Sequence, residues 1–102
     1  MKIYLDDLRP CPNGWILAKN AGEAITLLAT NLVEMISLDH DLGPPILTNG
    51  TGYEVIKYIE AMVYLDESYV PPEIIIHTGN PVGRKNMDLV LISIKRKLAE
   101  RE

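Results

Sequence analysis

The sequence has little cysteine, no long apolar run and no excess of basic residues. Cys11 is the only cysteine among 102 residues, which excludes an intrachain disulfide and a zinc site built from several thiolates. This use of cysteine fits a protein of the reducing cytoplasm. The formal net charge of −4 argues against a broad basic face for double-stranded DNA, because such binding depends on lysine and arginine displacing counterions.

We expect neither export nor membrane insertion from this sequence. No apolar stretch approaches the thickness of a bilayer, and Asp6 and Asp7 interrupt the N-terminal region where a secretory signal would be apolar throughout. There is no internal repeat and no low-complexity segment. With 47% apolar residues, the chain is long enough for one packed core, so we expect a single domain over residues 1–102.

What the sequence does have is an alternation of strand-like and helix-like segments. The expected strands are residues 2–5, 15–18, 35–38 and 74–76, short apolar runs that end at turn or polar residues. Helices are expected after the capping residues Asn20, Thr51 and Asn80, the first of them ending near Asn31. Residues 43–50 are expected to form a loop.

This order of elements predicts an α/β fold with a mostly parallel sheet of four strands, ordered 2-1-3-4. The connection between the first two strands is too short for a helix. It is roughly eight to ten residues, whereas a parallel crossover usually needs about a dozen, so antiparallel pairing of these two strands is the alternative.

Polar side chains follow three of the four expected strands. In open parallel sheets, ligands bind beyond the carboxyl ends of the strands. The residues at these ends are Asp6 and Asp7, then Asp39, His40 and Asp41, then His77, Thr78 and Asn80. Both histidines of the chain therefore fall at one expected edge of the sheet, which indicates a shared site.

The acidic residues of this edge suit a hard divalent cation. Carboxylates brought close together repel one another, and Mg²⁺ or Mn²⁺ relieves that repulsion through oxygen ligands. The expected metal ligands are Asp6, Asp7, Asp39 and Asp41. The alternative is that each aspartate caps a turn, which short acidic side chains do well.

The two histidines suit general acid and base catalysis, because imidazole titrates close to neutral pH. Either His40 or His77 could instead be a structural residue at a strand end, and a metal-ligand role is open for both. Tyr4 and Trp15 are interpreted as packing residues.

The start of the last helix predicts an anion site. Asn80 and Pro81 suit its cap and first position, and Arg84 and Lys85 follow within the first turn. Free backbone amides, the positive end of the helix dipole and two cations together favour phosphate. The alternative is an ordinary Asn-Pro helix start with two solvated cations.

Several strings resemble the receiver domains of response regulators. They are Ile3-Tyr4-Leu5-Asp6-Asp7, Ile36-Ser37-Leu38-Asp39, Thr51-Gly52-Tyr53 and Ile75-Ile76-His77-Thr78. The resemblance implies Mg²⁺ binding by Asp6, Asp7 and Asp39, with Asp39 as phosphate acceptor and Thr78 ending the fourth strand. The first helix of ordinary receivers is not visible, nor is the fifth strand with its lysine before proline, which argues against ordinary phosphorelay signalling. A receiver that accepts phosphate on Asp39 is one alternative function.

Longer strings are more similar to a divergent group, the cyclic-phosphate processing receiver-like domains. They are Leu5-Asp6-Asp7-Leu8-Arg9-Pro10, Ser37-Leu38-Asp39-His40-Asp41-Leu42-Gly43 and His77-Thr78-Gly79-Asn80-Pro81-Val82-Gly83-Arg84. This resemblance implies a compact, three-layer, flavodoxin-like domain. It also implies a phosphoesterase acting on 2′,3′-cyclic phosphate ends of RNA or of a nucleotide, for example in RNA repair.

The hypothesis drawn from this resemblance gives each site residue a role. His40, His77 and Asp39 are catalytic, and the phosphate is held by Arg9, Thr78, Asn80 and Arg84. The alternative is a non-enzymatic receiver-like module that binds a divalent metal or a phosphate ligand together with a protein partner or a second copy.

Overall fold

The computed structural model describes residues 1–42 and 50–101. Within them the elements are β1 (Lys2–Leu5), β2 (Ile16–Ala18), α1 (Ala21–Leu28), β3 (Met35–Leu38), α2 (Gly52–Leu65), β4 (Glu73–Ile76) and α3 (Pro81–Ala99). The predicted strands and helices are confirmed, with boundaries shifted by a few residues. The loop predicted for residues 43–50 falls almost wholly outside the described residues.

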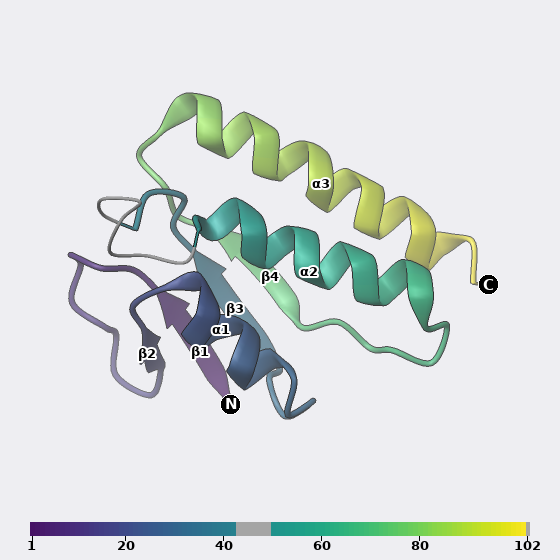
Figure 1. Cartoon of the computed structure of the whole chain (residues 1–102), viewed down its shortest axis with the longest axis horizontal. Coiled ribbons are helices and arrows are strands. Elements are labelled where there is room, and N and C mark those ends of the chain that lie inside the picture. The colour runs from purple at the N-terminus through teal and green to yellow at the C-terminus, as the bar shows by residue number, and fades with distance from the viewer. Residues whose placement is uncertain (43–49, 102) are drawn as a thin grey trace.

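The sheet has the predicted order β2-β1-β3-β4, and every neighbouring pair is parallel (Figure 1). The first two strands are therefore parallel, although the ten residues between them form no helix. Their register pairs Tyr4 with Leu17, and β3 continues the same row with Ser37. The carboxyl ends of all four strands consequently meet at one edge.

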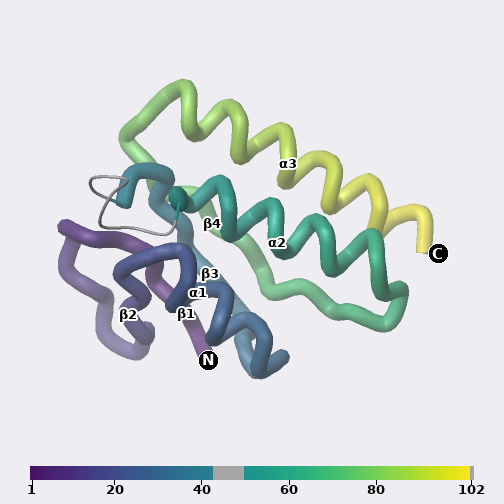
Figure 2. Tube along the Cα trace, viewed as in Figure 1, coloured from purple at the N-terminus to yellow at the C-terminus, as the bar shows by residue number. Residues whose placement is uncertain are grey.

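All three helices lie on one face of the sheet (Figures 1 and 2). The crossovers β2-α1-β3 and β3-α2-β4 advance across the sheet in the same direction, and right-handed connections then place both helices on the same side. α3 packs against α2. The described part of the chain thus has two layers instead of the expected three, because the connection that would carry a helix to the other face is too short to form one.

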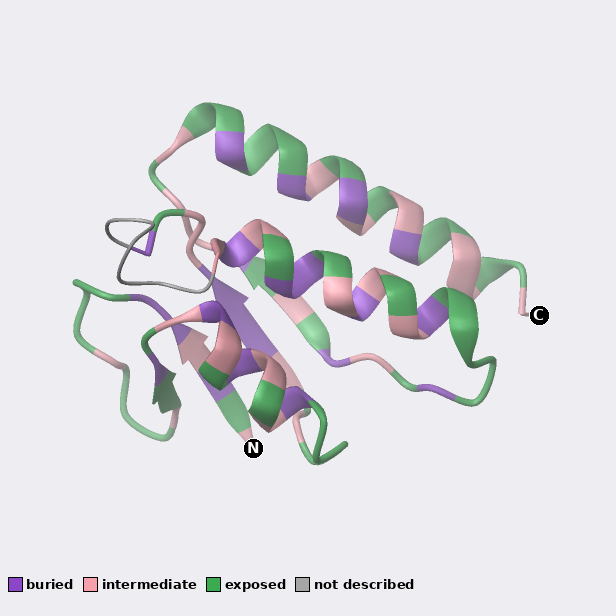
Figure 3. Ribbon diagram, in the orientation of Figure 1, coloured by how far each residue is buried: buried purple, intermediate pink, exposed green. Residues whose placement is uncertain are grey.

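The core lies between the sheet and these helices, as the band of buried residues in Figure 3 shows. Ile3, Leu5, Ile36 and Leu38 are fully buried on the helix side of the central strands. On the opposite face, Leu17 and Ile75 keep 37% and 40% of their surface exposed. One face of the sheet is therefore open to solvent.

Each helix begins at the predicted cap. The side chains of Asn20, Thr51 and Asn80 accept hydrogen bonds from the amides of Glu23, Tyr53 and Gly83. These caps fix where the chain leaves each strand end and turns into a helix. In the part of the chain that the structure describes, no helix combines the length and apolar character needed to cross a membrane.

Candidate functional site

The register of the sheet aligns three polar residues at the carboxyl ends of neighbouring strands. The amides of Asp6, Asp39 and His77 donate to Ala18, Leu5 and Leu38 of the neighbouring strands, at 2.9–3.1 Å. The hydrogen-bond ladder thus runs one residue beyond each strand and holds these three residues in one row. Residues that follow three separate strands in the sequence therefore lie side by side at one edge of the sheet.

Asp6 is the most enclosed polar residue of the row, with 1% of its surface exposed. Its Oδ1 accepts hydrogen bonds from the amides of Leu8 and Arg9 at 2.9 and 3.0 Å, which shapes the turn after β1. Its Oδ2 lies 3.0 Å from Nε2 of His77. Burial alone raises the pKa of Asp6, but these amides and His77 together outweigh it and hold the pKa below its usual value.

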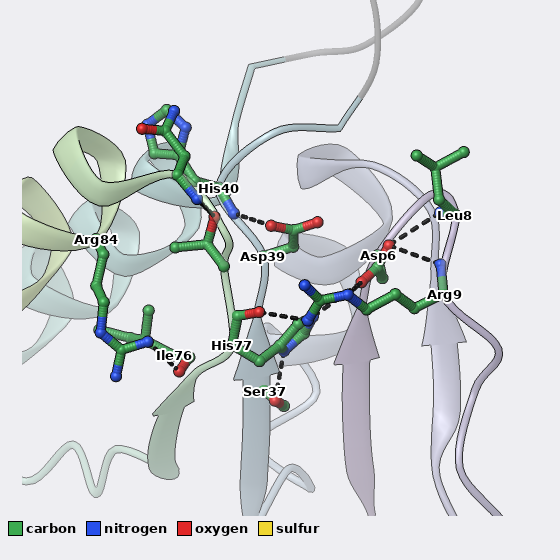
Figure 4. Close-up of polar contacts among 11 residues, drawn as sticks. Asp6, Leu8, Arg9, Ser37, Asp39, His40, Ile76, His77 and Arg84 are labelled. Atoms are coloured by element: carbon green, nitrogen blue, oxygen red, sulfur yellow. Dashed lines mark hydrogen bonds and ion pairs between the residues drawn. The ribbon is translucent and has the colours of Figure 1, made fainter.

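His77 has partners at both ring nitrogens, as Figure 4 shows. Nε2 faces Asp6, and Nδ1 lies 2.6 Å from the hydroxyl oxygen of Ser37. The Tyr4 ring stacks on the imidazole, parallel to it and 4.5 Å away between centroids. No role was predicted for Ser37, and Tyr4 was predicted only to pack. The signal was available, since both precede an acidic residue of the row by two positions and so share its face of the sheet.

His40 forms a second pair with a carboxylate. Its Nδ1 lies 2.9 Å from Oδ1 of Asp41, and Nδ2 of Asn80 donates to the same carboxylate at 3.3 Å. The His40 contact, opposed by burial and assisted by Asn80, lowers the pKa of Asp41. The His40 ring packs against the start of α3, where a Cβ on Gly83 would come within 2.5 Å of it. The two histidines therefore have separate partners and face in different directions.

A hollow of about 350 Å³ lies at this edge of the sheet. Its lining residues are Asp6, Asp7, Leu8, Arg9, Asp39, Asp41, Thr78, Gly79 and Asn80. Neither histidine lines it. Each histidine instead contacts a carboxylate that does, so two carboxylate–imidazole pairs stand at the hollow, Asp6 with His77 and Asp41 with His40.

The expected metal ligands are only partly brought together. Asp6, Asp39 and His77 each present one ligand atom, and these atoms lie within 4.8 Å of one another. Asp7 is exposed beside them, and Asp41 belongs to the second pair. Two carboxylates and an imidazole fit a divalent ion such as Mn²⁺. Oδ2 of Asp6 already contacts Nε2 of His77, so an ion held by all three residues would compete with the proton between them.

The residues expected to bind phosphate divide into two groups. Arg9, Thr78 and Asn80 line the hollow, and the Arg9 guanidinium is anchored by donating to the carbonyl of His77. Arg84 points elsewhere: it donates to the carbonyl of Ile76 at 3.0 Å, on the other side of the end of β4 (Figure 4). Sequence spacing placed Arg84 at the helix start but could not give the direction of its side chain.

Comparison with known families matches residues 1–93 of the chain to the cyclic-phosphate processing receiver domain. No curated protein matches the chain. The match covers all four strands, both carboxylate–imidazole pairs and most of α3, which are the parts of the molecule that build the hollow.

Proposed function

We propose that this chain, which belongs to the cyclic-phosphate processing receiver domain family, is a phosphoesterase that opens the 2′,3′-cyclic phosphate at the end of an RNA. The observation that carries the proposal is the pair of buried Asp6 with partly buried His77, in which the Asp6 carboxylate lines the hollow and the imidazole lies behind it. A buried carboxylate that orients an imidazole is suited to moving a proton.

Hydrolysis of a cyclic phosphate needs two proton transfers. Water attacks phosphorus and loses a proton, and the bond from phosphorus to one ribose oxygen breaks while that oxygen gains a proton. Two pairs at one hollow suit this requirement, one accepting the proton of the water and the other supplying the proton of the ribose oxygen. Asp6 and Asp41 would stand between the substrate and the imidazoles of His77 and His40.

Binding of the phosphate would depend on Arg9, the only cationic residue among the described residues that line the hollow. Its side chain is 50% exposed, so the guanidinium remains accessible while the His77 carbonyl fixes its position. The Thr78 hydroxyl and the Asn80 amide offer further hydrogen bonds to phosphate oxygens.

The charge of the hollow supports a divalent cation as part of this proposal. Four aspartates and one arginine line it, so an incoming phosphate anion meets net negative charge. Asp6 and Asp39 would hold the ion, which would neutralise the carboxylates and the phosphate oxygens, while both ring nitrogens of His77 keep their contacts with Asp6 and Ser37.

The activity is tested with an oligoribonucleotide that ends in a 2′,3′-cyclic phosphate, following its conversion to a phosphomonoester by ³¹P NMR. His77→Ala and His40→Ala should each reduce turnover by about a hundred- to ten-thousandfold. Lys95→Ala, an exposed residue far along α3, serves as the matched control with unchanged turnover. Near-full activity of either histidine variant would contradict the use of two carboxylate–imidazole pairs, whereas binding without turnover by the wild-type chain would contradict the phosphoesterase activity and favour the non-enzymatic module.

The cation is tested separately by melting temperature. An ion that binds only the folded chain raises the melting temperature by mass action, so millimolar Mn²⁺ or Mg²⁺ should do so. Asp39→Asn should remove most of the increase, and sodium chloride of equal ionic strength is the control. An unchanged melting temperature at millimolar ion would contradict a metal site.

A further inference from the structure

We infer that Ser37 is a positioning residue, which fixes the nitrogen of His77 that carries the proton. This role rests on the proposed use of the Asp6–His77 pair. Ser37 is in the middle of β3, between Ile36 and Leu38, and only 5% of its surface is exposed. A buried hydroxyl in an otherwise apolar strand requires a hydrogen-bond partner, and its partner is Nδ1 of His77 at 2.6 Å.

The direction of the hydrogen bond between Ser37 and Nδ1 follows from the contact that the other ring nitrogen, Nε2, makes with Asp6. The amides of Leu8 and Arg9 hold Oδ1 of Asp6 as an acceptor, which favours the ionised carboxylate. An ionised carboxylate only accepts, so the contact of 3.0 Å requires Nε2 of His77 to donate. In a neutral imidazole the other nitrogen must then accept, and the Ser37 hydroxyl donates to it. The tautomer with the proton on Nε2 therefore gives a hydrogen-bond partner to the Asp6 carboxylate, the His77 imidazole and the Ser37 hydroxyl.

Tyr4 holds the plane of the imidazole ring in this arrangement. The register places Tyr4 beside Ser37 on neighbouring strands, and the Tyr4 ring lies parallel to the imidazole, 4.5 Å away. A half-turn of the imidazole about its bond to Cβ would keep the ring plane but would turn ring carbons toward Ser37 and Asp6, so the two hydrogen bonds oppose that flip, and the stacking on Tyr4 opposes the orientations in between. Ser37 therefore selects the tautomer, and Tyr4 holds the plane of the ring.

Ser37 acts through His77 and not on the substrate, since it does not line the hollow. Removing its hydroxyl would leave Nδ1 with no donor. The ring could then place its proton on Nδ1 for part of the time, which would take the donor away from Asp6 and leave the pair without the shared proton that the proposed chemistry uses.

The direct test is the ¹⁵N NMR spectrum of the imidazoles in the full chain. Only two histidines are present, so comparison with His40→Gln identifies the signals of His77. At a pH where His77 is neutral, the wild-type ring should show a protonated Nε2 and an unprotonated Nδ1. Ser37→Ala should shift these signals toward a mixture of tautomers, and Ser37→Thr, which restores a hydroxyl, should return them.

Activity gives a second measurement. Ser37→Ala should lower kcat on the cyclic-phosphate oligoribonucleotide about ten- to a hundredfold with little change in KM, and Ser37→Thr should recover it. A wild-type His77 protonated on Nδ1 would overturn the inference even if Ser37→Ala failed to fold, and so would an unchanged spectrum in folded Ser37→Ala. If the spectra behave as expected but no chain turns over substrate, the proposed function fails and the positioning role of Ser37 stands.

Discussion

Asp6 uses both of its carboxylate oxygens, one for the turn after β1 and one for His77. Asp6→Ala removes the acceptor of two amides and an imidazole at a position that is almost fully buried. We expect it to lower the free energy of unfolding by about 2–3 kcal/mol, because buried donors without an acceptor cost about 1–3 kcal/mol each and some would reach water. Urea unfolding measures the change, and exposed Asp7→Ala should stay within about 0.5 kcal/mol of wild type.

The lowered pKa of Asp6 also predicts how stability depends on pH. The folded pKa is below that of the unfolded chain, which is about 3.9, so ionisation of Asp6 favours the folded state. Its contribution is complete above the unfolded pKa and is lost as the pH falls through the folded pKa. As the pH falls below about 5, the free energy of unfolding should therefore decrease more in the wild-type chain than in Asp6→Asn. Urea titrations at each pH measure the free energy of unfolding. If this free energy falls equally with pH in both chains, the prediction is contradicted.

At the scale of elements, the start of α2 is fixed against the end of β3 by a close approach of two backbones. The amide of Gly52 donates to the carbonyl of His40, and a Cβ on Gly52 would lie 1.7 Å from the carbonyl oxygen of Asp39. Only glycine allows the helix to begin this near to Asp39, so the helix and the site depend on the same contact.

Two glycine substitutions compare the cost of placing a Cβ against backbone, at Gly52, with the cost of placing one against a side chain, at Gly83. Gly52→Ala must move the backbone of Asp39, and we expect it to cost about 1–3 kcal/mol, the range of overpacked cores. The three atoms nearest to a Cβ on Gly83 all belong to the His40 ring, so the cost of Gly83→Ala should be largely removed when His40 is also alanine. Thermal unfolding of the single and double variants measures both effects. An unchanged cost of Gly83→Ala in the His40→Ala background would show that His40 is not the obstacle.

The elements and their order could be predicted from the sequence because caps, apolar periodicity and strand-end acids are local signals. Asp6, Asp39 and His77 were assigned to one edge for the same reason. The direction of Arg84 and the separation of His40 from His77 depend on which contacts the side chains make after packing, which spacing does not encode. Ser37 was passed over because its place two residues before Asp39 gives only the face of the sheet on which it lies, and its contact with His77 depends on the pairing of β3 with β4.

At the scale of the whole molecule, the helices cover one face of the sheet and leave the other exposed to solvent. Ile36 is fully buried beneath the helices, whereas Ile75 on the next strand is 40% exposed on the open face. Ile36→Ala should lower the free energy of unfolding by about 2–5 kcal/mol, through lost burial and a cavity. Ile75→Ala should cost about 1 kcal/mol or less. Equal losses for the two variants in urea unfolding would show that another layer covers the open face in solution.

Two aromatic residues near His77 also give the site an intrinsic fluorescence signal. Trp15 is the only tryptophan of the chain, and its ring meets that of Tyr4 edge-on at 6.3 Å, while Tyr4 stacks on His77. At this separation, excitation energy absorbed by Tyr4 passes to Trp15, so Tyr4 emits little of its own fluorescence in the folded chain. The emission of Trp15 is thus a built-in optical probe of the environment around His77, and no dye needs to be attached to follow a ligand entering the hollow.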